Sequence, residues 1–348
     1  MRIVILGIGS RGDVQPLVAL GVGLQKKGHQ VDVVSGDEFE GLVGVAGLGF
    51  IPLGVNIQAA MQQYTNMFQF AHSITGLVLQ ACGTETQAAP QSAEQSAPQP
   101  APQPDAIIAT FLGVSACSFA RERGIPFFYA VPMPGLSTQD FANPLFPPLK
   151  LGKGYNRMTY RISDNMAIKS YPYTQCLFQE PRPTYLFCFS EHVIPRPSDW
   201  GDFAHVTGYW SLQTPKNWQP PESLAAFLKA GPPPVCVSFG SMLEKNPEKV
   251  TRQVVTALDQ AKQRGILISG WGGLRRIDLP AEMIMLDSVP FDWLFPRVAA
   301  VVHHGGAGVT AAALRAGIPA VVVPFGLDQP FWGRQVKRLG VGPDPLPL

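Results

Sequence analysis

The sequence predicts an α/β protein built from two doubly wound, parallel-sheet domains that face a central cleft. A β-branched run at 2–7 is followed by glycines, a helical pattern at 15–27 and a second strand at 30–35. The same alternation of strand and helix signals starts again near residue 234. In each half, one strand also runs straight into a glycine-rich turn. This order is typical of parallel sheets with helices on both faces.

The first half continues the alternation around one interruption. Its further elements are strands at 49–53, 105–109 and 126–131, and helices at 39–46 and 114–123. Between them, residues 83–105 form a nearly uncharged run rich in Gln, Pro, Ala and Ser. Because such a composition cannot bury a core, we predict a disordered surface insert there.

The second half repeats the pattern after a stretch, 133–218, whose elements are hard to assign. Its predicted elements are strands at 234–239, 266–269, 283–286, 299–303 and 320–324, and helices at 247–264 and 307–316. A Pro- and Gln-containing stretch places the boundary between an N-terminal domain, 1–215, and a C-terminal domain, 216–348. A cleft at the carboxyl ends of two such sheets can hold two different substrates.

Composition excludes several classes of protein. Charged residues are 15% of the 348, the net charge is +2, and no basic run suggests nucleic acid. The five cysteines form no CxxC pair, so we expect neither a disulfide framework nor a zinc site, and a reducing, cytoplasmic location. The apolar N-terminus is interpreted as a strand rather than a signal peptide, and no stretch of about 18 apolar residues spans a membrane.

The first motif, Gly7 to Pro16, directly follows the first strand. Its glycines match G-x-G-x-x-G, and Asp32 lies about 20 residues on, so an NAD(P)-dependent oxidoreductase is one interpretation. The presence of Asp13 argues against an NAD(P) site, because a carboxylate at the N-terminal end of a helix repels a pyrophosphate. If Pro16 occupies the first helical turn, Asp13 lies before the helix and is exposed to the cleft, as a catalytic base or simply as a helix cap.

The second motif, Val301 to Thr310, is a strand, a glycine-rich turn and a helix. Free N–H groups and the positive end of a helix dipole bind phosphate at such a turn. Consecutive strand residues point to opposite faces, so only one of two adjacent histidines can face a ligand. We predict His303 in that role and His304 as a satisfied structural residue. Residues 235–241 and 324–330 add weaker signals, small residues and a polar pair at strand ends.

Together, Gly9–Pro16, His303–Thr310 and Asp328–Trp332 resemble glycosyltransferase family 1, especially sterol 3-beta-glucosyltransferases and glycopeptide-antibiotic glycosyltransferases. The resemblance implies the GT-B fold and an inverting transfer of a hexose from a UDP- or dTDP-sugar to an apolar sterol, lipid or natural product, without a metal or other cofactor. Asp13 would be the general base. Predicted donor-binding residues are Ser10, Ser238, Gly240, Ser241, Trp271, Val289, His303, Gly305, Gly306, Ala307, Gly308, Val309, Thr310, Asp328 and Gln329.

This chain departs from the family at three places. Val309 stands where close relatives usually carry Thr, and Ala311 stands where plant members carry a ribose-binding Glu. The chain also stops at Leu348, where family members continue through further helices, the last of which returns to the N-terminal domain. We therefore expect a truncated C-terminal domain and a weaker connection between the two domains. A catalytically weak binding protein of the same fold is thus another alternative.

The acceptor side is less well determined. Aromatic and methionine side chains at 61–70 suit an apolar acceptor pocket, a membrane-facing lip or ordinary core. We predict Met61, Phe68 and Met133 as acceptor-binding residues, and a peripheral membrane contact as a candidate partner interaction.

Overall fold

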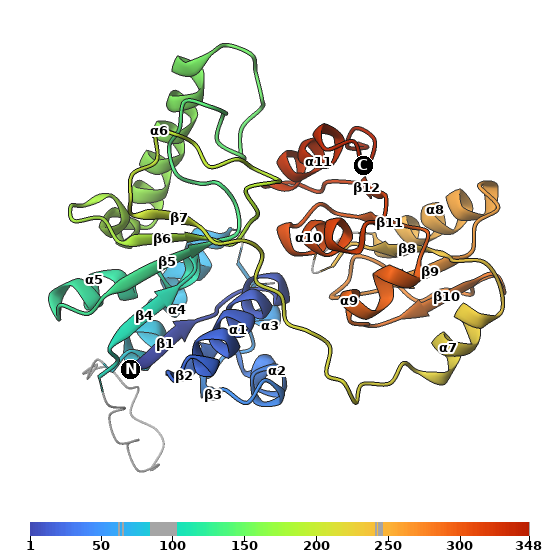
Figure 1. Ribbon diagram of the computed structural model, residues 1–348, viewed down its shortest axis with the longest axis horizontal. Helices are drawn as coiled ribbons and strands as arrows, with labels where there is room; N and C mark the ends of the chain where they lie inside the picture. Colours follow the sequence, from blue (N-terminus) through green and yellow to red (C-terminus); the bar gives the residue numbers. More distant parts are fainter. Residues whose placement is uncertain (62, 65, 84–102, 241, 243–245, 348) are drawn as a thin grey trace. The chain divides into compact units, whose positions relative to one another are not determined.

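In the computed structural model, described for residues 1–61, 63–64, 66–83, 103–240, 242 and 246–347, the chain divides into two compact units (Figure 1). Unit 1 comprises Met1–Glu191 and Pro195–Leu212, and unit 2 comprises His192–Ile194 and Gln213–Leu348. The predicted insert at 83–105 lies almost wholly outside the described residues. No described helix combines the length and apolar character that crossing a bilayer requires.

Unit 1 is built on a seven-stranded sheet in which all neighbouring strands run parallel, in the order β3-β2-β1-β4-β5-β6-β7. The strands are β1 Arg2–Leu6, β2 Gln30–Ser35, β3 Gly49–Pro52, β4 Ala106–Ala109, β5 Phe127–Val131, β6 Thr184–Phe187 and β7 Ala204–Val206. The order reverses beside β1, which places the carboxyl ends of β1 and β4 at a switch point of the sheet.

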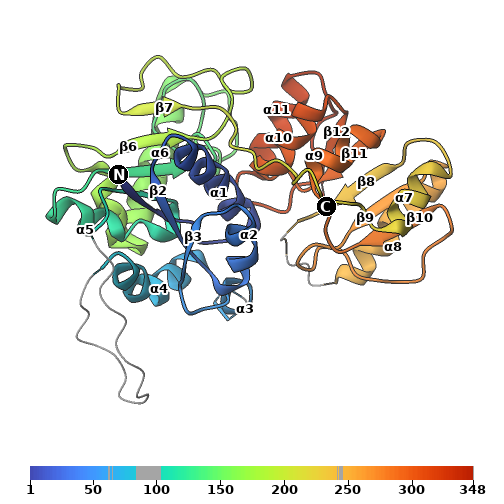
Figure 2. The same ribbon diagram turned by 60° about the horizontal axis from the view of Figure 1, so that its bottom comes forward.

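Helices cover both faces of this sheet, with α1 (Arg11–Lys26) and α4 (Met67–Ala81) on opposite sides (Figures 1 and 2). That placement follows from right-handed crossovers, because the chain moves in opposite directions across the sheet after β1 and after β3. The other helices are α2 Glu40–Val45, α3 Ile57–Met61, α5 Ala116–Glu122 and α6 Lys153–Ser170, with 3₁₀ turns at Asp37–Phe39, Phe111–Gly113 and Pro172–Phe178. Val4, Ile5 and Leu6 of β1 are fully buried, as expected of a strand covered on both faces.

Unit 2 has a five-stranded parallel sheet in the order β10-β9-β8-β11-β12. The strands are β8 Val235–Ser238, β9 Gly265–Ile268, β10 Met283–Leu286, β11 Ala300–His303 and β12 Ala320–Val322. The helices are α7 Glu222–Lys229, α8 Pro247–Gln260, α9 Phe291–Leu294, α10 Ala307–Ala316 and α11 Gln329–Arg338, with a 3₁₀ turn at Phe295–Arg297. Alternate residues of β8 and β9 enter two different core clusters, one holding Cys236 and Ile266 and the other Val237 and Leu267.

Two doubly wound parallel sheets confirm the predicted fold class. Several helices, α7 and α11 among them, were not predicted, and the differences at α1 and α6 have physical reasons. α1 begins at Arg11, so Pro16 lies inside the helix and not in its first turn. α6, the longest described helix, lies within the stretch that sequence reasoning could not assign. It begins after Gly152 without a side-chain cap, and several apolar residues on it face solvent, so its pattern carries neither start signal nor core-facing stripe.

A disulfide in unit 1 corrects the expectation drawn from the cysteine spacing. Cys117 of α5 and Cys176 of the 3₁₀ turn after α6 are bonded, with sulfur atoms 2.23 Å apart. The pair is separated by 59 residues, which no local motif can reveal. Arg121 ties the same two segments together, because its guanidinium donates to the backbone carbonyls of Cys176, Gln179 and Glu180.

We predict that reduction of this disulfide lowers the free energy of unfolding of unit 1. A cross-link across 59 residues restricts the unfolded chain and contributes up to about 4 kcal/mol in the loop-entropy description. Urea unfolding with and without dithiothreitol measures the difference. The double variant Cys117→Ala/Cys176→Ala is the control, since its unfolding should not respond to reductant; an equal response would assign the effect to other cysteines.

Candidate functional site

Asp13 lies in the first turn of α1, three residues after the N-cap, Ser10. Its Oδ2 accepts hydrogen bonds from the Ser10 backbone N–H (2.8 Å) and from the Ser10 hydroxyl (2.9 Å). Among the described residues no hydrogen bond reaches Oδ1. One carboxylate oxygen therefore caps the helix, while the other remains available to a proton donor.

Gly9 allows this arrangement, and a larger residue would not. Its φ is +136°, where residues with a side chain are strained. A Cβ built on Gly9 would lie 2.5 Å from Asp13 Oδ2 and 2.9 Å from Asp13 Cβ. The glycine that suggested a dinucleotide fingerprint is therefore required here by a carboxylate in close contact with the backbone.

The prediction that Asp13 lies before the helix and exposed is wrong: it is part of α1 and half-buried. Burial raises the pKa of this carboxyl above its ordinary value, and the two hydrogen bonds from Ser10 oppose the shift. Ser10, predicted to bind the donor, commits both its N–H and its hydroxyl to Asp13. It therefore acts as a positioning residue for the carboxylate.

Asp32 does not support the dinucleotide interpretation. It is the third residue of β2 and pairs with β1 at Val4, away from the carboxyl end of the strand. Its Oδ2 forms an ion pair with Arg2 Nε at 2.9 Å. A ribose-binding acid is expected at the strand end, where the cofactor lies.

Sequence reasoning missed a second buried group near Asp13. Cys188 directly follows β6 and is a free thiol, and burial together with the charge of Asp13 raises its pKa to about 12. The signal available in the sequence was its position at a strand end, which alone is too weak to single out a cysteine.

In unit 2 the turn after β11 presents backbone donors. α10 starts at Ala307 after the N-cap Gly306, with no side-chain cap. Thr310 N–H is the first in the helix to bond backwards, to Gly306 O at 3.0 Å. The N–H groups of Ala307, Gly308 and Val309 have no acceptor among the described residues. A helix N-terminus of this kind binds anions.

His303, at the end of β11, adds a further donor beside this turn. Its side chain is 0% exposed, and Gly305 N–H donates to its Nδ1 at 3.0 Å. Burial, with a smaller contribution from His304, lowers its pKa to about 3, so the ring is neutral and its proton lies on Nε2. Nε2 is buried and has no partner among the described residues. Such an N–H calls for an acceptor.

His304 lies between two glycines of this region. A Cβ on Gly240 would meet its Cε1 at 2.8 Å, and a Cβ on Gly306 would meet its Nε2 at 2.5 Å. Burial lowers its pKa to about 4. Its buried Nδ1 has no hydrogen-bond partner among the described residues, whereas a hydrogen bond with the Ser238 backbone opposes the fall in pKa, so the ring is partly satisfied.

The loops after β8 and β9 meet through a glycine pair. Gly240 and Gly270 both have positive φ, and a Cβ on Gly270 would lie 2.1 Å from Gly240 O. Trp271 N–H donates to the same carbonyl at 3.1 Å. Trp271 and Gly240, both predicted as donor-binding residues, therefore belong to one loop cluster at the carboxyl edge of the sheet, beside Ser238, which is buried. Ser241 lies outside the described residues.

Four side chains predicted to meet the donor are buried or hydrogen-bonded within unit 2. The Thr310 hydroxyl donates to Gly306 O at 2.8 Å inside the helix. The Gln329 carboxamide is buried and accepts from Phe325 N–H at 2.7 Å, which closes the loop before α11. Val289 and Val309 are part of the apolar core. These side chains support the loops, and only their backbones remain candidates for contact with a ligand.

Asp328 and the predicted acceptor residues keep partly accessible positions. Asp328 is half-buried at the start of α11, and its Oδ2 accepts from Trp332 Nε1 at 2.8 Å. Phe68 packs edge-on against Phe111, which follows β4, with ring centroids 5.7 Å apart. Met133 follows β5 at the same edge of the sheet. Met61 ends α3 and is also half-buried.

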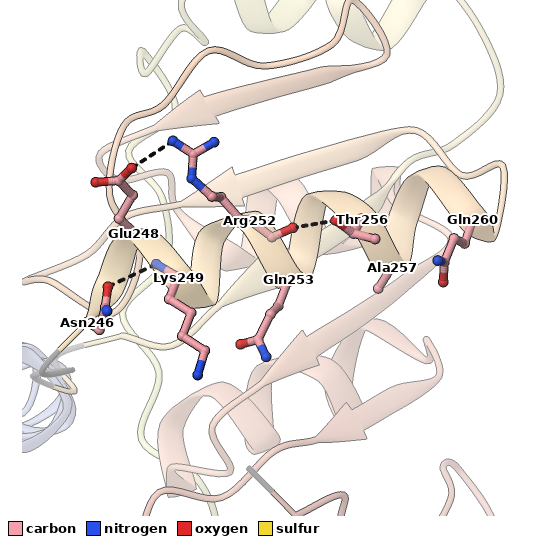
Figure 3. Close-up of a pocket in the computed structure, with 8 residues that line it drawn as sticks. All are labelled: Asn246, Glu248, Lys249, Arg252, Gln253, Thr256, Ala257 and Gln260. Carbon is pink, nitrogen blue, oxygen red and sulfur yellow. Dashed lines mark hydrogen bonds and ion pairs between the residues drawn. The ribbon is translucent and has the colours of Figure 1, made fainter.

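Two hollows lie elsewhere on the units. A cavity of about 440 Å³ between α3 and α4 is lined by Tyr64, Phe70 and Ile74 among others, but not by Met61, Phe68 or Met133. The second, of about 620 Å³, follows the exposed side of α8, where Glu248, Arg252 and their neighbours point into solvent (Figure 3). Because every lining residue comes from α8 or its N-cap, Asn246, this is a solvated helix face and not an enclosed site.

Two family models match the chain, one in each unit. The glycosyltransferase family 28 N-terminal domain matches residues 3–141, and the erythromycin biosynthesis protein CIII-like C-terminal domain matches residues 252–346. A sterol 3-beta-glucosyltransferase of Arabidopsis thaliana is 37% identical over 381 residues, which cover 100% of this chain and 58% of that protein. One from Leptosphaeria maculans is 34% identical over 98% of this chain and 25% of its own length. The chain thus spans about three fifths of the plant relative.

Solved glycosyltransferase structures share the fold. The glycotransferase of kitacinnamycin superposes with a TM-score of 0.65 at 19% identity, over 98% of this chain and 85% of that one. The calicheamicin glycosyltransferase CalG4 superposes with a TM-score of 0.64 at 17% identity, over 100% of this chain and 86% of that one. These likenesses confirm the predicted GT-B fold.

We predict that the neutral state of His303 makes stability fall as the pH drops. Its folded pKa, about 3, lies below the ordinary value of 6.5, so the unfolded chain binds the proton more readily. Stability is therefore complete above pH 6.5 and decreases below it, by about 2 kcal/mol at pH 5. Urea unfolding at pH 5 and pH 7 should show this loss in the wild type, and His303→Asn should lose about 2 kcal/mol less, because the lowered pKa of His304 contributes a loss of its own. If the imidazole NMR signal of His303 titrated between pH 5 and 8, the prediction would be contradicted.

Proposed function

We propose that this chain is a glycosyltransferase of GT-B fold that transfers a hexose from a nucleotide-diphosphate sugar to the hydroxyl of an apolar acceptor such as a sterol. The observation that carries this proposal is the set of unpartnered donors at the end of β11. The N–H of His303 Nε2 lies at the end of β11 and three N–H groups lie in the first turn of α10, and none of the four has an acceptor among the described residues. A diphosphate supplies the acceptor oxygens that these groups lack.

The proposed acceptor rests on the relatives and on the carboxyl edge of the unit 1 sheet. Two relatives of this chain carry the name sterol 3-beta-glucosyltransferase. In this chain, Phe68, Phe111 and Met133 place apolar surface at the strand ends beyond β4 and β5. That is the same edge from which Asp13 follows β1. An apolar alcohol is thus the class of acceptor that suits these residues.

In the proposed reaction Asp13 accepts the proton of the acceptor hydroxyl. That oxygen attacks the anomeric carbon as the bond to the leaving diphosphate breaks, which inverts the configuration. A base with a raised pKa holds the proton better than an ordinary carboxylate. The negative charge that develops on the diphosphate is met by His303 and the first turn of α10, so we propose that no divalent metal is needed. Undiminished turnover in EDTA tests that part.

The overall proposal is tested by incubation with UDP-[¹⁴C]glucose and a mixed sterol extract, followed by extraction of labelled lipid. The same assay with the dTDP-sugar distinguishes the nucleotides. NADH absorbance, followed separately, tests the oxidoreductase alternative. Nucleotide-sugar binding without labelled lipid would instead favour the catalytically weak binding protein.

We predict that Asp13→Asn lowers turnover by about 10²–10⁴ because the amide cannot accept the proton, while nucleotide affinity stays nearly unchanged. In the wild type, turnover should rise with pH as Asp13 loses its proton, and this limb should be absent in the variant. Initial rates across pH and calorimetric titration with UDP measure both effects. Asp202→Asn, at an exposed position, is the control. Full turnover in Asp13→Asn would remove this residue from the mechanism.

We predict that His303→Ala weakens both UDP affinity and turnover, because it removes a preorganised donor to the diphosphate. An affinity loss of about 10-fold or more corresponds to one hydrogen bond to a charged group. Isothermal titration calorimetry with UDP measures it, and His205→Ala on the exposed side of β7 serves as the matched control. Equal affinity in wild type and variant would show that His303 only supports the turn.

A further inference from the structure

An apolar stripe with basic flanks covers the outward side of α6 in unit 1. Met158, Ile162 and Met166 follow one another at intervals of four residues and are 48%, 39% and 57% exposed. Residues four apart on a helix lie on one side, so these three side chains form a continuous stripe. Most exposed apolar residues need no explanation, but a contiguous row of large ones marks an interaction site.

The segment before α6 extends the stripe. Leu145, Leu149 and Leu151 are 44%, 52% and 68% exposed. Three hydrogen bonds hold residues 139–147 against the helix: Tyr155 hydroxyl to Pro147 O (2.7 Å), Asn156 Nδ2 to Gln139 O (2.8 Å), and Asn143 N–H to Thr159 Oγ1 (2.8 Å). Leu145 lies in this fastened stretch, and Leu149 and Leu151 follow it before α6 begins.

Charge along the sequence of this segment has one dominant sign, although Asp140 and Asp199 of neighbouring segments also act electrostatically on groups of α6. Residues 141–170 contain five basic side chains and one acidic side chain, against a net charge of only +2 for the whole chain. Arg157, Arg161 and Lys169 are exposed on α6, and no ion pair between described residues involves them. The one acid, Asp164, is half-buried and lies away from the exposed row.

We propose that α6 and residues 145–151 dock this protein on an anionic membrane surface, with the six apolar side chains entering the interface and the basic residues meeting lipid phosphates. Apolar residues that enter the acyl boundary and flanking cations that meet anionic headgroups together produce interfacial binding. The alternative location suggested by the sequence, the lip at 61–70, fits less well: Tyr64 and Met67 are exposed, but Phe70 is buried and Phe68 packs on Phe111.

Vesicle co-sedimentation of the whole chain tests the proposal independently of enzymatic activity. We expect binding to phosphatidylcholine vesicles that contain 30% phosphatidylglycerol, and much weaker binding to phosphatidylcholine alone or in 0.5 M salt. Arg157→Gln/Arg161→Gln/Lys169→Gln should lower partitioning on anionic vesicles by about 100-fold, since each cation contributes about fivefold. The matched loss of three exposed cations elsewhere, Lys26→Gln/Lys27→Gln/Lys229→Gln, should have a far smaller effect.

The apolar contribution needs its own variant. Met158→Gln/Ile162→Gln/Met166→Gln should lower partitioning by about tenfold or more, whereas Val45→Gln, a single exposed apolar residue on α2, should not. In addition, brominated lipid should quench the fluorescence of the tryptophan added in Ile162→Trp and not that of the tryptophan added in Val45→Trp. Because all these positions are exposed, unchanged thermal unfolding serves as the folding control.

Three outcomes would overturn the proposal. The wild type could fail to bind anionic vesicles, or the α6 variants could bind as the wild type does. The Met158→Gln/Ile162→Gln/Met166→Gln variant could also abolish a dimer detected by sedimentation equilibrium without lipid, which would assign the stripe to a second copy of the chain.

Discussion

The candidate donor site depends on one hydrogen bond, from the Gly305 N–H to Nδ1 of His303. This bond fixes which nitrogen of the imidazole carries the proton, and burial keeps the ring neutral. The result is an N–H donor on Nε2 with no acceptor among the described residues, beside a helix that begins without a side-chain cap. A fold that leaves such groups unpaired loses stability unless a ligand supplies the acceptors.

Close backbone approach at glycines is the second constraint, and it acts in both units. Gly9 lets Asp13 fold back over the chain, Gly270 lets two loops meet at Gly240, and Gly306 makes room for His304. A single methyl group at each position would meet another atom at 2.8 Å or less. These glycines therefore set the positions of the carboxylate and of the groups proposed to face the diphosphate, although they supply no chemistry themselves.

The sequence was sufficient for the fold class and for the two glycine-rich turns, because both depend on local patterns. α10 and β10 occur at the predicted residues, and the other strands of unit 2 differ from prediction by no more than two residues at either end. Local patterns could not predict where a side chain points or which distant residue it pairs with. Gln329 and Thr310 have side chains that can bind a sugar or a phosphate, but the fold uses both for internal hydrogen bonds. The Cys117–Cys176 bond was missed because its two cysteines lie 59 residues apart. α6 was missed because it has no side-chain cap and exposes apolar residues to solvent.

Two features of the position of Asp13 act on its pKa in opposite directions, the hydrogen bonds at the helix end and burial. As a cap at the first turn of α1, it is stabilised in its charged form by Ser10 and by the helix dipole, which weakens it as a base. Burial raises its pKa and strengthens it as a base. Both hydrogen bonds go to Oδ2, so a proton taken up on Oδ1 need not break them. A carboxylate held in this way can accept a proton while the helix end, and with it the distance to the acceptor, stays fixed.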